Sequence, residues 1–150
     1  MPARLPALTP LDYAALARFR RELRRFLAFS ERASHIAGLE PQQHQLLLAL
    51  RGFGSPDRAP TIGEIAEWLL IQHHSAVELV DRAVARGLVE RQQDAHDRRR
   101  VLVQLTPAGE AILAQLSLQH REELESTAPA LLAALGDVLQ PRPQSQARAH

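Results

Sequence analysis

Apolar residues recur at helical spacing over most of this chain. From Leu11 they return every three or four positions, with arginines on the opposite face, which predicts a helix that stops near Gly38. A second helix begins at Pro41, because proline is tolerated in the first turn, where its missing N–H makes no helical bond. Its apolar residues surround much of its circumference, which is typical of a buried helix. They are Leu46, Leu47, Leu48 and Leu50.

The centre of the chain predicts two short helices joined by a tight turn. Thr61 and Glu64 have the spacing of a capping box, in which each side chain accepts a hydrogen bond from the other residue's backbone N–H. The turn covers residues 70–72, with Gln72 as the next N-cap, and the second helix runs from His73 to about residue 86. The residues predicted to face inward are Ile65, Trp68 and Leu69 in the first helix, and Ala76, Leu79, Val80 and Ala83 in the second.

A β-hairpin follows this second helix, which ends at Gly87. Residues 88–92 and 100–105 predict two strands, since Val101, Val103 and Leu105 alternate with Leu102 and Gln104. The residues between them, 93–99, form a polar loop.

Two further helices complete the predicted pattern. Thr106 and Pro107 supply an N-cap hydroxyl and a first-turn proline, and the helix that they start ends at about Ser126. Pro129 predicts a break, after which a last helix covers residues 130–139.

Composition limits the possible functions. The chain has no cysteine, which excludes disulfides, thiolate metal sites and cysteine redox sensors. It lacks a Gly-rich phosphate loop, a His-x-x-x-His pair and an acidic cluster at metal-ligand spacing, so we expect no enzyme, no cofactor and no metal. A regulatory metal site made of His35, His44 and a partner chain is the alternative. No apolar run approaches the roughly 20 residues that span a bilayer, and the N-terminus lacks a signal-peptide core, so we expect a cytoplasmic protein without a membrane partner.

Positive charge is clustered, although the net charge is only +1. All 18 basic residues are arginine, whose planar guanidinium suits paired hydrogen bonds to phosphate. The clusters are Arg18, Arg20, Arg21, Arg24 and Arg25 near the start, and Arg98, Arg99 and Arg100 in the hairpin. Arg82 and Arg86 follow each other at helical spacing. We expect them to contact phosphates or to be held by Asp81 and Glu78.

Two short helices and a hairpin that carries three arginines are the layout of a winged helix-turn-helix, a module that binds DNA. The predicted fold is therefore mainly α with a small β-hairpin wing (α+β), extended by N- and C-terminal helices. The exposed first half of the second helix would enter the major groove of double-stranded DNA. Its residues are His73, His74, Ser75, Val77 and Glu78.

These five residues suit base recognition only in part. Ser75 can contact a base or a phosphate, and Val77 can touch a thymine methyl group. Glu78 is unfavourable beside phosphates unless it accepts from cytosine or pairs with Arg82. The two histidines have an alternative interpretation as surface residues at a helix start.

Four stretches of the chain resemble the MarR family of bacterial transcription regulators. They are LVDRAVARGLVER at residues 79–91, DAHDRRRVLVQLTPAG at 94–109, FRRELRRFLAFSERA at 19–33 and PQQHQLLLAL at 41–50. The resemblance implies a homodimer in which the first helix and the last two intertwine with those of a partner. The implied domains are a helical dimerisation region (11–38 and 107–139), a winged module (40–106) and flexible termini (1–10 and 140–150). The expected dimer contacts are Phe19, Leu23, Leu116, Leu131 and Leu135.

The same resemblance assigns roles to the hairpin loop. In the family pattern, the second arginine of Asp-Arg-Arg enters the minor groove and the aspartate orients it. This makes Arg99 the inserted side chain and Asp97 its positioning carboxylate, with Arg98 and Arg100 as phosphate contacts. A narrow A·T-rich minor groove attracts arginine through its enhanced negative potential. The alternative for the loop is a solvated, charged hairpin.

The resemblance also implies a repressor that reads a pseudo-palindromic operator and, as in many members, releases it when a small, often aromatic acid binds. The implied ligand cleft lies between the first helix, the second helix and the winged module. Its expected lining residues are Phe26, Phe29, His44, Leu47, Phe53 and Trp68. A fully packed junction without a ligand is the alternative to this cleft. The rival function is a winged module that contacts proteins rather than DNA, which Glu78 and a nearly neutral charge balance leave open.

Overall fold

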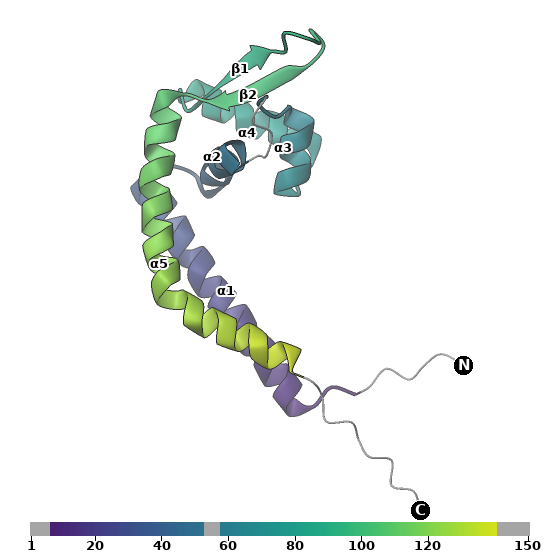
Figure 1. Ribbon diagram of the computed structural model, residues 1–150, viewed down its shortest axis with the longest axis vertical. Coiled ribbons are helices and arrows are strands. Elements are labelled where there is room, and N and C mark those ends of the chain that lie inside the picture. Colours follow the sequence, from purple (N-terminus) through teal and green to yellow (C-terminus); the bar gives the residue numbers. More distant parts are fainter. Residues whose placement is uncertain (1–6, 53–57, 141–150) are drawn as a thin grey trace, which may run out of the picture. The chain divides into compact units, whose positions relative to one another are not determined.

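The computed structural model describes residues 7–52 and 58–140. Within these residues the chain forms five helices and one two-stranded antiparallel sheet (Figure 1). The elements are α1 (Pro10–Ile36), α2 (Pro41–Gly52), α3 (Ile62–Leu69), α4 (His73–Ala85), β1 (Val89–Gln93), β2 (Val101–Leu105) and α5 (Pro107–Leu139). This confirms the predicted fold, mainly α with a small β-hairpin.

The chain divides into two compact units. Unit 1 contains the chain up to Phe29 and from Glu122 onwards, and unit 2 contains Ser30–Arg121. Unit 2 therefore holds the winged module together with the end of α1 and the first half of α5. The division predicted from sequence, at residues 38–40 and 106–107, concerns which helices bind a partner and stays a prediction. Of the predicted flexible termini, residues 1–6 and 141–150 lie outside the described residues.

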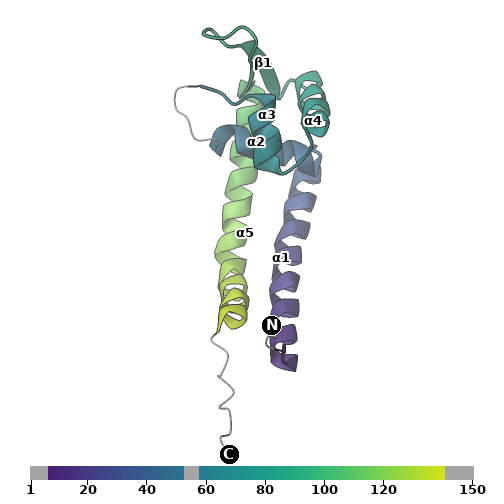
Figure 2. The ribbon, with the colours of Figure 1, turned by 90° about the vertical axis from the view of Figure 1, so that its right-hand side faces the viewer.

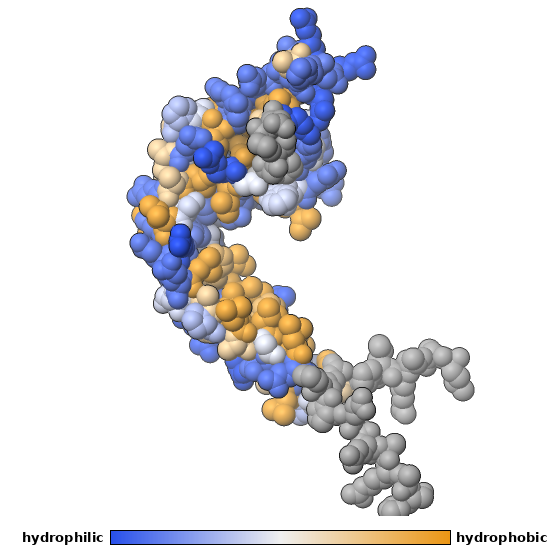
Figure 3. Space-filling model, in the orientation of Figure 1, coloured by the Kyte–Doolittle hydropathy of each residue, from blue (hydrophilic) through white to orange (hydrophobic). Residues whose placement is uncertain are grey.

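Unit 1 is a pair of antiparallel helical segments. The start of α1 and the end of α5 lie side by side (Figure 2), and Arg18 Nη1 donates to Asp137 Oδ2 at 2.6 Å. Only a narrow line of small residues is buried between them, including Ala15 and Ala134. Large apolar side chains remain on the outside of the pair, where Figure 3 shows them gathered in orange. They are Leu8, Leu11, Tyr13, Leu16, Leu27, Leu132, Leu135 and Leu139.

The predicted break at Pro129 is wrong, because α5 is one helix of 33 residues that runs through it. A proline inside a helix removes one backbone hydrogen bond and costs about 3 kcal/mol, but it does not always end the helix. Here apolar residues on its C-terminal side pack within unit 1: Leu131 is half-buried and Ala134 is buried. The Thr127 hydroxyl also donates to the carbonyl of Glu123 at 2.9 Å. Tertiary packing thus outweighs the local preference.

The core of unit 2 is built around α2. Leu46 and Leu47 are completely buried, as the sequence predicted, but Leu48 is 46% exposed and Leu50 is half-buried, so α2 keeps one open face. Other fully or almost fully buried side chains of this core are Ile65, Leu79, Val80, Val103 and Leu116. Leu116 has no surface left for a second chain, so its assignment to the dimer contacts is wrong.

The capping box that starts α3 is present. Thr61 Oγ1 accepts from the backbone N–H of Glu64 at 3.3 Å, and Glu64 Oε2 accepts from the backbone N–H of Thr61 at 2.8 Å. Ile65 is buried and Leu69 is half-buried, as expected, but Trp68 is 60% exposed. The prediction that Trp68 faces inward is wrong, because the buried stripe of this short helix passes through Ile65 and Ala66 and leaves Trp68 at its edge.

The hairpin pairs Val89 with Leu105 at its base and Gln93 with Val101 at its far end. Leu102 and Val103 are both buried, although consecutive strand residues point to opposite faces. The simple in-out alternation predicted for β2 is therefore wrong, since both faces of the strand are covered at this point. On its free edge, β2 pairs with the chain before α3: Val103 N–H donates to the carbonyl of Pro60 at 2.9 Å.

The junction of the hairpin and α5 depends on a glycine. Thr106 Oγ1 accepts from the backbone N–H of Gly109 at 3.1 Å and donates to the carbonyl of Gly87 at 2.6 Å, which confirms the predicted helix start. A Cβ atom at position 109 would lie 2.1 Å from the carbonyl oxygen of Leu88. This approach to the backbone gives a physical reason for Leu-Thr-x-x-Gly at the start of α5.

Candidate nucleic-acid interface

The first half of α4 presents polar side chains to solvent. His73, His74 and Glu78 are exposed, and Ser75 and Val77 are half-buried. The opposite face of α4, formed by Ala76, Leu79, Val80 and Ala83, is buried as predicted. Gln72 is the N-cap, but its side chain makes no capping hydrogen bond. The structure thus places all five predicted major-groove residues on the part of α4 that is not packed into the core.

The turn between α3 and α4 is tight because Leu70 adopts a left-handed conformation, with φ 56° and ψ 41°. This conformation costs a residue with a side chain about 1–2 kcal/mol. Leu70 is 91% exposed, so burial of its side chain does not compensate for the cost. The backbone N–H of Ile71 donates to the carbonyl of Ala66 at 3.0 Å, which closes the turn.

The hairpin tip, residues 94–100, is held by two aspartates. Asp97 Oδ1 accepts from the backbone N–H of Arg99 at 3.0 Å, and the Asp97 carbonyl accepts from the N–H of Arg100 at 3.0 Å. Asp94 Oδ1 accepts from the backbone N–H of His96 at 2.9 Å, and this bond lowers the pKa of the Asp94 carboxyl. Asp97 therefore fixes the backbone at Arg99 rather than its guanidinium. The role of Asp94 was missed, because its spacing does not match the family motif.

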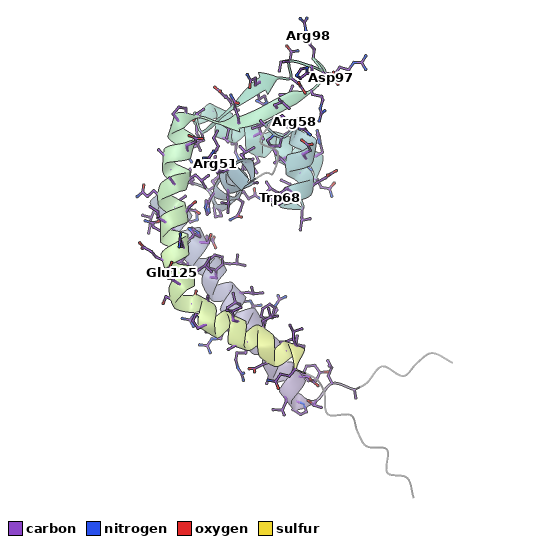
Figure 4. The ribbon with its side chains drawn as sticks, viewed as in Figure 1. Arg51, Arg58, Trp68, Asp97, Arg98 and Glu125 are labelled. Carbon is purple, nitrogen blue, oxygen red and sulfur yellow. The ribbon has the colours of Figure 1, made fainter. Side chains whose placement is uncertain are left out.

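Arg98 and Arg99 point outward from this tip. Both are exposed, and among the residues that the structure describes neither makes an ion pair. Figure 4 shows Arg98 extending from the end of the hairpin near Asp97. Arg100 is half-buried and its guanidinium lies 4.0 Å from Glu64 Oε1. The free positive charge of the tip is thus concentrated on two adjacent side chains.

The arginines of α4 and β1 have partners inside unit 2. Arg82 Nε lies 3.4 Å from Glu40 Oε2, and Arg86 donates to Gln43 Oε1 at 2.8 Å and to the carbonyl of Gly38. The expectation that Asp81 or Glu78 would hold them is wrong: Asp81 pairs with Arg91 instead. These partners lie 10 to 48 positions away in the sequence, so helical spacing alone could not identify them.

A further ionic cluster, not predicted from the sequence, links the wing to α3. Arg58 donates from Nη1 to Glu64 Oε2 at 2.8 Å and from Nη2 to Oε1 at 2.5 Å. The hydrogen bonds from Arg58, and then that from the backbone of Thr61, lower the pKa of Glu64 to about 2. One carboxylate therefore caps α3, binds the preceding loop and faces Arg100 at the base of the tip. Arg58 had looked like an ordinary residue of a Gly- and Pro-containing loop.

The residues predicted to line a ligand cleft are divided among different surroundings. Phe26 and Phe29 belong to unit 1, Phe53 lies outside the described residues, and His44 and Leu47 are buried in unit 2. Trp68 lines an open pocket with residues of α2 and α4. The cleft between the winged module and the first helix stays a prediction.

His44 lies in a small polar cluster in the interior of unit 2. Its ring centroid is 4.6 Å from that of His120, whose ring nitrogens bond the carbonyl of Leu116 at 2.7 Å and Ser30 Oγ at 2.8 Å. His44 Nδ1 is buried without a hydrogen-bond partner in the described chain. Burial, and then the charge of His120, lower the pKa of His44 to about 4. In the described residues no group of three or more metal-binding side chains gathers around it.

Comparisons with known proteins agree with this geometry. Residues 37–100 match the model of the MarR family. The chain belongs to the MarR family. Over 64 residues it is 36% identical to YsmB of Bacillus subtilis (strain 168), an HTH-type transcriptional regulator, and the match spans 43% of this chain and 44% of that protein. The chain thus matches less than half the length of this relative. Membership in a family of transcription regulators agrees with the expectation that the chain is not an enzyme.

Solved structures show the same fold over most of the chain. A mutant of MarR from E. coli, solved in complex with operator DNA, is 23% identical and has a TM-score of 0.61, with 81% of this chain and 90% of that chain covered. The transcriptional repressor CouR, solved with a 23-mer DNA duplex, is 26% identical and has a TM-score of 0.62, with 81% and 89% covered. In the described part of this MarR-family chain, no helix is both long enough and apolar enough to cross a membrane.

Proposed function

We propose that this MarR-family protein is a DNA-binding transcription regulator that acts as a dimer on a pseudo-palindromic operator. The observation that carries the proposal is the hairpin tip, where Asp94 and Asp97 fix the backbone and leave Arg98 and Arg99 exposed without ion pairs. A fixed backbone with free guanidinium groups suits contact with phosphates and with a narrow minor groove. The membership of the family and the DNA complexes of MarR and CouR support the same function.

Within this proposal, Arg99 enters the minor groove and Asp97 positions it through the backbone. Arg98 and Arg100 contact phosphates, and Arg82 joins them by exchanging Glu40 for a phosphate. The exposed first half of α4 lies in the major groove, where its residues meet base edges. These are His73, His74, Ser75, Val77 and Glu78. The site requires no cofactor and no metal.

The second chain is proposed from the apolar surface of unit 1. Leu11, Leu132 and Leu139 are 81%, 67% and 71% exposed, and Phe19, Leu23 and Leu131 are half-buried beside them. A contiguous apolar surface of this kind marks an interaction site. Its burial against a second copy would place two wings on one DNA duplex, with half-sites about 10 base pairs apart. A Leu132→Asp variant should then be a monomer in light scattering, while Gln115→Asp, on an exposed position of α5 in unit 2, should stay a dimer.

Further parts of the proposal follow the family. The protein acts as a repressor in the cytoplasm, where bacterial DNA lies, and a small aromatic or acidic effector releases it from the operator. The cleft assigned to this effector involves Phe26, Phe29, His44 and Leu47, together with Phe53 and Trp68.

The test is to sequence the genomic DNA fragments that the purified protein retains and to measure its affinity for the enriched sequence. We expect an inverted repeat, and an affinity that falls steeply between low and high salt because each phosphate contact releases counterions. Enrichment of no sequence, or an affinity that salt leaves unchanged, would contradict the proposal. The rival function, a winged module that binds proteins, would then be favoured by the acidic Glu78 on α4.

A further inference from the structure

Unit 2 contains an open pocket that the proposed DNA contacts do not use. Its volume is about 430 Å³, within the range of roughly 300–1,000 Å³ that small-molecule sites occupy. It lies between α2, the end of α3, the turn and α4. The lining residues are Gln42, Gln45, Leu48, Ala49, Gly52, Trp68, Leu69, Ile71 and Leu79. We call it the α2–α4 pocket.

The walls of the α2–α4 pocket are apolar and remain accessible. Leu79 and Ala49 are buried, while Leu48 and Trp68 are 46% and 60% exposed. An exposed tryptophan beside exposed leucine is unusual for a surface without a ligand or partner, since these side chains gain the most from leaving water. The indole also offers a flat surface on which an aromatic ring can stack.

The chemistry of the lining selects against charge. None of the nine lining residues is ionisable, and the polar ones are the amides Gln42 and Gln45. Arg51, the nearest cation along α2, lies 3.7 Å from Glu110 of α5 instead. An anion in this pocket would lose water without gaining a positive partner, which is costly. An uncharged group can bond the two amides, because glutamine both donates and accepts.

We propose that the α2–α4 pocket binds an uncharged planar aromatic molecule that stacks on Trp68 and bonds Gln42 or Gln45 through an amide or hydroxyl group. Such a molecule contacts α2 and both helices of the helix-turn-helix. This site differs from the cleft implied by the family resemblance, which would take an acid between the first helix and the winged module.

The chain offers a direct measurement, because Trp68 is its only tryptophan. The full-length protein is titrated with 2-naphthamide and with 2-naphthoate, which have the same ring system and differ in charge at neutral pH. We expect a saturable change in Trp68 fluorescence with the amide, and an affinity for the carboxylate weaker by about tenfold or more. Equal binding of both probes, or no saturable change with the amide, would overturn the proposal.

Two variants test the charge argument. Leu48→Arg and Gln45→Arg each place a cation at the pocket rim, and either should reverse the preference so that 2-naphthoate binds better than 2-naphthamide. The control, Gln119→Arg, adds the same charge at an exposed position of α5 and should leave the preference unchanged. Far-UV circular dichroism verifies the fold of each variant, and the second rim variant keeps the test valid if one does not fold. A folded rim variant with an unchanged preference would contradict the proposal. Since no DNA is present, this outcome is independent of the proposed regulation.

Discussion

The two solvent-exposed parts of the winged module, α4 and the hairpin tip, differ in how they are held. One face of α4 is buried along its length, and its arginines have protein partners, such as Glu40 for Arg82. The tip is tied down through backbone hydrogen bonds to Asp94 and Asp97, and Arg98 and Arg99 stay unpaired in the described structure. The number of arginines in an element therefore does not measure the positive charge available to a ligand.

The comparison also separates side chains that can change partner from those that have a structural role. The Arg82–Glu40 pair is exposed on both sides, at 44% and 55%, and such pairs contribute only about 0–1 kcal/mol. Arg82 can exchange this partner for a phosphate at little cost. Arg86 instead connects Gln43, which is buried, with the carbonyl of Gly38, so its loss would affect packing before binding.

The largest expected effect concerns the base of the hairpin. A Gly109→Ala change places a Cβ atom 2.1 Å from the Leu88 carbonyl oxygen, so the start of α5 must move away from β1. We expect a loss of at least about 3 kcal/mol in the free energy of unfolding, measured by denaturant titration. Gly63→Ala is the matched control, because its Cβ would meet only Thr61 Oγ1 at 3.9 Å. Similar stabilities of the two variants would show that the hairpin does not depend on this close approach.

The second prediction compares the tip with α4 directly. Each arginine–base contact contributes about 1–3 kcal/mol, so Arg99→Ala should weaken operator binding by roughly 2–6 kcal/mol in a dimer with two wings. Arg82→Ala should cost about 1 kcal/mol or less per site, because Arg82 already has a protein partner. Fluorescence anisotropy with a labelled operator measures both, and light scattering verifies the dimer. Equal losses would remove the distinction between tip and helix.

The third prediction concerns the core behind α4. The pKa of His44 is about 4 in the folded chain and 6.5 in the unfolded chain, so the unfolded state binds more protons between these values. Stability should therefore fall as the pH decreases from 6.5 towards 4, by roughly 2 kcal/mol at pH 5. Denaturant titrations at pH 7 and pH 5 measure this, and His44→Met should lose that part of the pH dependence. If both proteins respond equally to pH, His44 is not the residue responsible.

The smallest predicted effect lies in the turn that connects α3 and α4. Leu70 has a positive φ and is 91% exposed, so glycine should relieve the strain without removing a buried side chain. Leu70→Gly should stabilise the fold by about 0.5–1 kcal/mol, after allowing for the greater flexibility of glycine in the unfolded chain. Thermal unfolding detects this change. A clear loss of stability would instead show that the Leu70 side chain has packing partners.

Short-range patterns in the sequence determined much of this protein. The capping box of Thr61 and Glu64, the helix start at Thr106 and the buried stripe of α4 were predicted correctly, because their partners lie three or four residues apart. The Asp-x-x-Asp-Arg-Arg motif likewise indicated the family, since its spacing is preserved in the sequence itself.

Only the tertiary structure decided which partner each longer side chain meets. Arg58 with Glu64, Arg86 with Gly38 and Gln43, and the exposure of Trp68 depend on how separate elements pack. The same holds for the helix through Pro129 and for the complete burial of Leu116. Local spacing can show that a residue lies on a helix face. Which neighbour covers that face depends on contacts between distant segments, and these contacts distinguish the free arginines of the tip from the paired ones of α4.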